Sequence, residues 1–93
     1  MAITERQFAR AFEDFLRLKG WKYYHTFNSR HSVAGFPDYV LVRGPRLLFV
    51  ELKAERGKMT PAQIDWQEAL ITAAVPHYVW YPSSWATIER TLE

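Results

Sequence analysis

Cysteine is absent from this chain of 93 residues, and its absence narrows the chemistry available. Without thiols there is neither a disulfide framework nor a thiolate metal site, so a bound metal must use oxygen or imidazole ligands. Long apolar runs are also missing, because none approaches the ~20 residues that a membrane span requires. The charged segment from Met1 to Arg10 has no apolar signal-peptide core. These absences predict a cytoplasmic protein with no membrane partner.

What the chain does contain is enough apolar material for one small domain, which we expect to cover residues 1–93. Hydrophobic residues make up 48% of it and aromatic residues 16%. The net charge of +2 is only mildly basic, but six Lys or Arg side chains stand against three acids between Asn28 and Lys58. We expect this local excess to surround Asp38, where it would suit a phosphate backbone, although a solvated surface would explain it equally well.

Hydrophobic spacing and turn residues predict the element order α-β-β-β-α-β-α. A capping box at Thr4 and Gln7 opens a helix from Glu5 to Lys19, and Gly20 ends it. A second box, Thr60-Pro61-Ala62-Gln63, opens a helix that ends before Pro76. Ser83-Ser84 is expected to cap a final short helix ending near Leu92. The predicted strands are Trp21–Phe27, Asp38–Arg43, Arg46–Lys53 and His77–Tyr81.

This order favours an α/β fold in which helices flank one mixed sheet. The second and third strands should form an antiparallel hairpin, since only Gly44-Pro45 separates them. Leu47-Leu48-Phe49-Val50 is apolar at every position, which predicts a strand buried on both faces.

Acidic residues stand at the open end of this predicted hairpin. Asp38 begins the second strand within Gly35-Phe36-Pro37-Asp38, and Glu51-Leu52-Lys53 ends the third. A turn at Gly44-Pro45 places the start of one strand opposite the end of the other, so Asp38 should approach Glu51 and Lys53. Two neighbouring carboxylates need a cation or a raised pKa, and Mg²⁺ or Mn²⁺ favours such oxygen ligands. A sheet-edge ion pair and a turn aspartate are the structural alternatives.

Further candidates flank this pair. The backbone carbonyl of Leu52 could supply another ligand, and Lys53 could stabilise charge developing on a phosphate. On a helical wheel Glu5 falls on the apolar stripe of the first helix, whereas Glu13 falls outside it and looks solvated. Gln63 either serves only the capping box or also reaches the site.

The GxPD element, the ExK element and the following Thr60-Pro61-Ala62-Gln63 helix start together resemble the VRR-NUC domain. This is the virus-type replication-repair branch of the PD-(D/E)xK nuclease superfamily, and the resemblance runs from Glu5 to the final helix. It implies a restriction-endonuclease-like core. It also implies that Asp38 and Glu51 bind metal, that Lys53 is catalytic, and that Glu5 and Gln63 belong to the site.

By this resemblance the expected activity is a Mg²⁺- or Mn²⁺-dependent DNA endonuclease. Branched DNA such as a four-way junction is the expected substrate, a homodimer the expected assembly, and a phage or prophage the expected source. A nicking or restriction-like nuclease and a non-catalytic DNA-binding module are the alternatives. Exposed aromatic residues near the C-terminus could form the dimer surface. Trp66, Trp80, Tyr81 and Trp85 could stack on bases, but packing in the core or between subunits is favoured for them. The expected DNA-contacting residues are His25, Asn28, Arg30, His31 and Lys58.

Overall fold

The computed structural model describes residues 3–26 and 33–93, and it has the predicted element order with one added 3-10 turn. The first two capping boxes are confirmed, at Thr4 with Gln7 and at Thr60 with Gln63. The elements are α1 (Glu5–Leu18), β1 (Lys22–His25), β2 (Tyr39–Arg43), β3 (Arg46–Leu52), α2 (Pro61–Thr72), β4 (His77–Trp80), η1 (Pro82–Ser84) and α3 (Trp85–Thr91).

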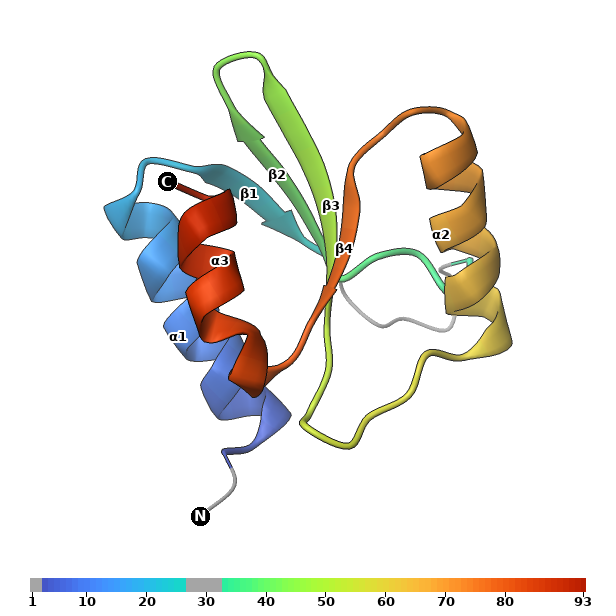
Figure 1. Cartoon of the computed structure of the whole chain (residues 1–93), viewed down its shortest axis with the longest axis horizontal. Helices are drawn as coiled ribbons and strands as arrows, with labels where there is room; N and C mark the ends of the chain where they lie inside the picture. The colour runs from blue at the N-terminus through green and yellow to red at the C-terminus, as the bar shows by residue number, and fades with distance from the viewer. Residues whose placement is uncertain (1–2, 27–32) are drawn as a thin grey trace.

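The four described strands form one mixed sheet in the order β1-β2-β3-β4 (Figure 1). The predicted β2–β3 hairpin is confirmed, with Arg43 paired to Arg46 across the two-residue turn. Gly44 has a φ of 57°, a left-handed value that a glycine adopts without strain. The β3–β4 pair is parallel, because α2 carries the chain back across the sheet between them.

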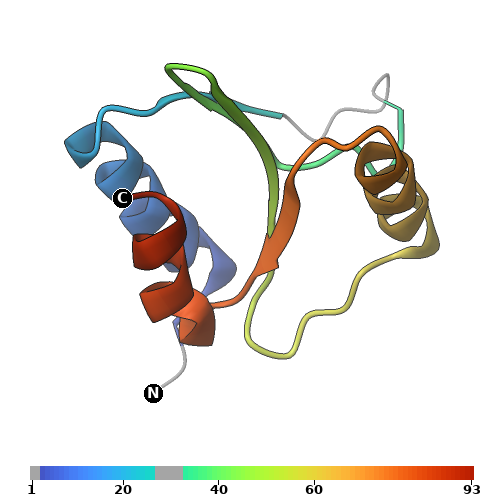
Figure 2. The same cartoon turned by 45° about the horizontal axis from the view of Figure 1, so that its top comes forward.

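Helices α1 and α3 cover one face of the sheet, and α2 lies on the other (Figure 2). The core fills the space between the sheet and the α1–α3 pair. Phe12 of α1 is fully buried there, and its ring meets Tyr39 and Trp80 edge to face. Trp85 packs in the same way on Phe8. Packing in the core, which the sequence offered as one role for Trp80 and Trp85, is therefore the role they have.

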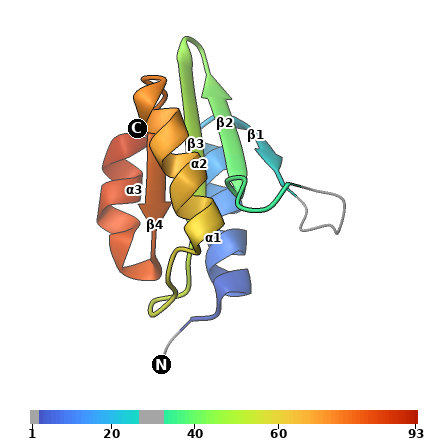
Figure 3. The same ribbon diagram turned by 90° about the vertical axis from the view of Figure 1, so that its right-hand side faces the viewer.

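The opposite face of the sheet is covered less completely. Figure 3 shows α2 in front of β3 and β4, with β1 and β2 to one side of it. Phe36 fills the space under α2, meeting Phe49 and Trp66 edge to face. No residue of α2 is fully buried. The prediction that β3 is buried on both faces is wrong at Leu47, which is 43% exposed because α2 does not reach that end of the strand.

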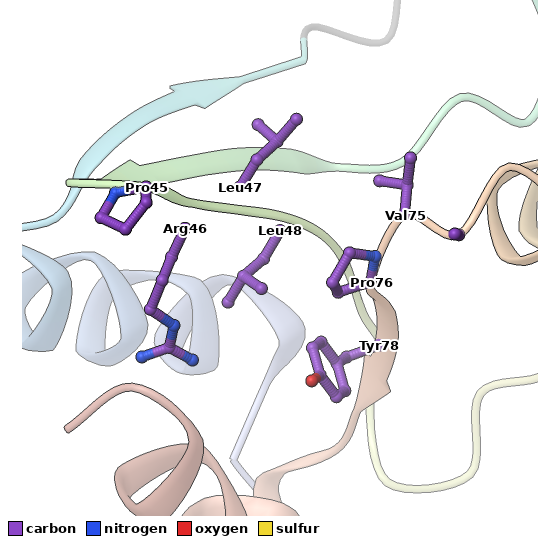
Figure 4. Close-up of a pocket in the computed structure, with 8 residues that line it drawn as sticks. Pro45, Arg46, Leu47, Leu48, Val75, Pro76 and Tyr78 are labelled. Atoms are coloured by element: carbon purple, nitrogen blue, oxygen red, sulfur yellow. The ribbon is translucent and has the colours of Figure 1, made fainter.

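The turn end of the hairpin lies beyond the reach of β4. β4 pairs with β3 only from Phe49 onward. A cavity of about 440 Å³ opens beside the earlier part of β3, which has no β4 neighbour (Figure 4). In this view Arg46 and Leu48 point toward the helices, whereas Leu47 points to the other face.

Arg43 and Arg46 are structural cations at this end of the molecule. Each guanidinium lies over the ring of Trp21, at 4.5 and 5.0 Å from its centroid. They also donate hydrogen bonds to backbone carbonyls near the C-terminus, Arg46 to Thr91 and Arg43 to Leu92. The prediction that the basic excess of residues 28–58 surrounds Asp38 is therefore wrong for these two arginines, which lie at the opposite end of the strands.

Smaller corrections concern where elements begin and end. The first helix ends at Leu18, β1 is limited to Lys22–His25, and β4 ends at Trp80. Phe27, predicted at the end of the first strand, lies outside the described residues. Ser84 precedes α3 but makes no side-chain cap, because its hydroxyl accepts a hydrogen bond from the backbone N–H of Tyr81.

In the part of the chain that the structure describes, no helix is both long enough and apolar enough to cross a membrane.

Candidate active site

The loop before β2 brings Asp38 to the end of β3. Gly35 has a φ of 88°, and a Cβ placed on it would lie 2.4 Å from backbone atoms of Ala62 at the start of α2. Only glycine therefore allows this loop to pack so closely against the helix. The Asp38 Oδ2 atom accepts a hydrogen bond of 2.9 Å from the backbone N–H of Leu52. The predicted approach of Asp38 to the end of β3 is confirmed.

The backbone carbonyl of Leu52 is left available on the same side of β3. In a strand, the N–H and C=O of one residue point the same way, so this carbonyl shares the side on which Asp38 binds the Leu52 N–H. Tyr39 pairs with Val50, and two further steps of the register set Pro37 opposite Leu52. Pro37 has no N–H to donate. Pro37 therefore cannot donate a backbone hydrogen bond to the Leu52 carbonyl from this position.

Glu51 is the most unusual group in the site. Its side chain is 0% exposed, and within the described residues neither carboxylate oxygen has a hydrogen-bond partner. The pKa of Glu51 is raised to about 8, chiefly by burial and next by the negative charge of the nearby Asp38. Lys53 acts in the opposite direction on this pKa, but less strongly. A buried carboxylate without donors is costly unless a cation compensates it.

The donors at this end of the sheet fit a hard divalent cation. Two carboxylates and one backbone carbonyl are oxygen ligands, which Mg²⁺ and Mn²⁺ prefer. Among residues 3–26 and 33–93, no group of three or more His, Asp or Glu side chains comes close enough to hold a metal. Within the described residues, the oxygen donors that could hold such a cation are therefore Asp38, Glu51 and the Leu52 carbonyl, without a third acidic side chain.

Lys53 and Gln63 meet beside these carboxylates. The Lys53 Nζ donates to Gln63 Oε1 at 2.7 Å, and the same oxygen accepts the backbone N–H of Thr60 at 2.9 Å. The two roles that the sequence offered for Gln63 are therefore combined in one atom. Capping α2 orients the amide, and the oriented amide holds the lysine.

A cavity of about 540 Å³ lies at this position between α1, β1 and α2. Glu5 lines it but is exposed, so the predicted inward-facing acid lies at the rim of the cavity. It does not form a three-ligand group with Asp38 and Glu51. The described residues that line this cavity are Glu5, Arg6, Ala9, His25, Thr26, Asp38, Tyr39, Leu52 and Gln63.

Glu13 is not the solvated residue that the helical wheel predicted. The buried Tyr39 hydroxyl donates to its Oε2 at 2.5 Å, and the Tyr23 hydroxyl donates to its Oε1 at 3.3 Å. Burial and then Glu13 raise the pKa of Tyr39. His25 stacks on Tyr39 with ring centroids 4.4 Å apart, and its Nδ1 lies 3.6 Å from Glu13. Glu13 thus anchors the residue that follows Asp38.

The expected DNA-contacting residues divide into two groups. His25 lines the cavity, and Lys58 is exposed in the connection between β3 and α2, outside the cavity lining. Asn28, Arg30 and His31 lie outside the described residues.

Comparison with known proteins shows the family and the fold of this chain. The profile of the VRR-NUC domain family matches residues 5–83, so the chain belongs to this family of nuclease domains. A solved structure described as a VRR_NUC domain superposes with a TM-score of 0.70 at 21% sequence identity. The match covers 95% of this chain and 94% of that one, and it shows the same fold. A comparison with functionally curated proteins finds no significant match.

Proposed function

We propose that this nuclease domain is a divalent-metal-dependent DNA endonuclease that uses Mg²⁺ or Mn²⁺. The observation that carries the proposal is the fully buried Glu51, whose two oxygens have no hydrogen-bond partner among the described residues. Asp38 lies close enough to raise the pKa of Glu51, so a second carboxylate is at hand. When bound, a divalent cation supplies Lewis-acid polarisation of the scissile phosphate.

The residues of the chain divide the remaining work. Asp38 and Glu51 supply carboxylate oxygens, and the Leu52 carbonyl adds a neutral donor. Lys53, held by Gln63, orients the attacking water and stabilises negative charge that develops on the phosphate. Glu5, at the rim of the cavity, can contact the site through water.

Branched DNA is the proposed substrate, as the family resemblance suggests. Cutting both strands of a junction symmetrically requires two sites, and a two-fold homodimer supplies them. Trp80 cannot form its surface, because it is buried in the core, and Trp85 is partly buried against the same core. Exposed apolar residues instead lie on α2 and on the sheet face beside it: Tyr24, Val42, Leu47, Ile64 and Ile71. We place the dimer surface there, and light scattering at micromolar concentration should give twice the monomer mass.

A cleavage panel tests the proposal. Duplex, flap, fork and four-way-junction DNA are incubated with Mg²⁺ or Mn²⁺, and parallel reactions contain EDTA. We expect metal-dependent cutting that is fastest on the branched substrates; equal rates on all four would favour a nicking nuclease without junction preference.

Lys53→Met should lower the cleavage rate at least 100-fold, in the range typical of losing one preorganised donor. Lys19→Met is the matched control, since Lys19 lies at the far end of α1 over the ring of Phe15. Wild-type cutting by Lys53→Met, or cutting by the wild type in EDTA, would refute the proposed mechanism. A protein that binds DNA but cuts none of these substrates would be the non-catalytic module.

A further inference from the structure

Another cavity, of about 330 Å³, adjoins the catalytic cavity along α1. The two cavities have Arg6, Ala9 and His25 in common, so they meet beside the first turns of the helix. We call the smaller one the α1 cavity. Its lining residues are Arg6, Ala9, Arg10, Glu13, Asp14, Arg17 and His25.

Both acids of the α1 cavity are already engaged inside the protein. Glu13 accepts hydrogen bonds from the hydroxyls of Tyr39 and Tyr23. Asp14 pairs with Arg17 at 2.5 Å, and Arg17 also donates to the Tyr23 hydroxyl at 2.7 Å. Asp14 is thus neutralised by Arg17, and the Glu13 carboxylate is held by the two tyrosine hydroxyls rather than by an arginine.

Arg6 and Arg10 are the other two arginines of the α1 cavity. Both are exposed, and in the described part of the chain no carboxylate lies within salt-bridge distance of either. They are one helical turn apart on α1, which separates them by about 6 Å along the helix axis. Each strand of a duplex carries one phosphate per ~3.4 Å of axis, so the two side chains can reach nearby phosphates of one strand.

We propose that Arg6 and Arg10 bind the sugar-phosphate backbone of the DNA strand where it leaves the catalytic cavity. Arg6 lines both cavities and contacts the phosphate nearer the cut, and Arg10 contacts one further along. Arginine suits this role because its planar guanidinium binds phosphate oxygens through two parallel hydrogen bonds. These contacts fix the strand in register with the site without reading its sequence. This inference rests on the proposed function, whose substrate it positions.

Salt-dependent binding tests the inference independently of cutting. The probe is a fluorescein-labelled four-way junction, and its binding is followed by anisotropy in EDTA over a series of salt concentrations. Losing two phosphate contacts should reduce the slope of log K against log[salt] by about two and weaken binding roughly tenfold or more at ~0.1 M salt. We expect this of the Arg6→Ala/Arg10→Ala variant, in which alanine is a good helix former.

The matched control is Lys19→Ala/Arg90→Ala, which removes the same charge from a separate cavity that Lys19 and Arg90 line together. Lys19 is about 20 Å along α1 from Arg6. We expect the control to keep the wild-type slope, and Arg6→Lys/Arg10→Lys to keep most of it. An unchanged slope in Arg6→Ala/Arg10→Ala, or an equal loss in the control, would overturn the inference.

The cleavage panel separates this inference from the proposed function. A reduced slope in a protein that cuts nothing would support the phosphate contacts and refute the nuclease mechanism. Metal-dependent cutting by the wild type, together with an unchanged slope in Arg6→Ala/Arg10→Ala, would support the nuclease mechanism and refute the phosphate contacts.

Discussion

Replacing Glu51 with glutamine should stabilise the metal-free protein while removing its activity. Glu51 is fully buried, and its pKa of about 8 lies well above the ordinary value of 4.5. Between these two pH values the unfolded chain has released a proton that the folded chain still holds. Each pKa unit is worth 1.36 kcal/mol, so the carboxyl costs about 3 kcal/mol of stability at pH 7. Glutamine keeps the shape of the side chain and cannot ionise.

The sign of this effect fixes its pH dependence. Because the pKa of Glu51 is raised in the folded state, the contribution of this group to the free energy of unfolding is most favourable below about pH 4.5. That contribution is lost as the pH rises toward 8. The gain from Glu51→Gln should therefore be below ~1 kcal/mol at pH 5, about 3 kcal/mol at pH 7 and larger at pH 8. A gain of 3 kcal/mol would raise the Tm of a domain of this size by roughly 10–20 °C.

Urea unfolding in EDTA, followed by tryptophan fluorescence, measures these differences. Glu68→Gln is the control, since Glu68 is exposed on α2 and its neutralisation should change stability by less than about 0.5 kcal/mol. A Glu51→Gln protein that is no more stable than the wild type at pH 7 would refute the reasoning. So would a gain of equal size at pH 5 and pH 8, because it could not come from the carboxylate charge.

Adding Mn²⁺ should reverse the order of stability. A cation that binds only the folded wild type stabilises it by about 4.1 kcal/mol at 1,000 times its dissociation constant, which exceeds the ~3 kcal/mol advantage of Glu51→Gln at pH 7. Glu51→Gln lacks one carboxylate ligand and should respond much less. A thermal shift of equal size in both proteins would show that Mn²⁺ binds elsewhere.

Three more variants test backbone strain at two glycines and the burial of a histidine. Gly35→Ala should cost more than about 2 kcal/mol in urea unfolding, because a Cβ meets the backbone of Ala62 and φ is positive. Gly44→Ala should cost only about 1 kcal/mol, since φ is positive there but the space is open, and equal costs would exclude the clash. Burial lowers the pKa of His77, so this group favours folding above about pH 6.5 and loses that contribution as the pH falls. His77→Leu should therefore gain stability relative to the wild type as the pH falls from 7 to 5, and a difference that does not change with pH would show that His77 makes no such contribution.

Most of the site could be predicted because its geometry follows from local rules. The Gly44-Pro45 turn sets the hairpin register, and the register then brings Asp38 to the end of β3. The capping box of α2 likewise places Gln63 at the helix start, from which it reaches Lys53. In both cases a contact between distant residues depends on a turn or a cap that a few neighbouring residues determine.

Contacts between α1 and the sheet could not be predicted in this way. A helical wheel treats every position off the apolar stripe as solvated, yet Glu13 faces the hydroxyls of Tyr39 and Tyr23. Hydroxyl groups on the covered face of a sheet leave no periodic signal in the sequence. Proximity in sequence was also misleading for Arg43, which stands only five residues after Asp38 but at the other end of the strand.

The double role of the Gln63 amide oxygen limits how this position can evolve. One atom caps α2 and holds Lys53, so a substitution that loses the oxygen weakens the helix start and releases the lysine together. Glutamate is the one replacement that keeps an acceptor at the same reach, and it would add a charge beside the lysine. Sequences that retain cleavage activity should therefore vary between glutamine and glutamate at this position, while the exposed surface of α2 changes freely.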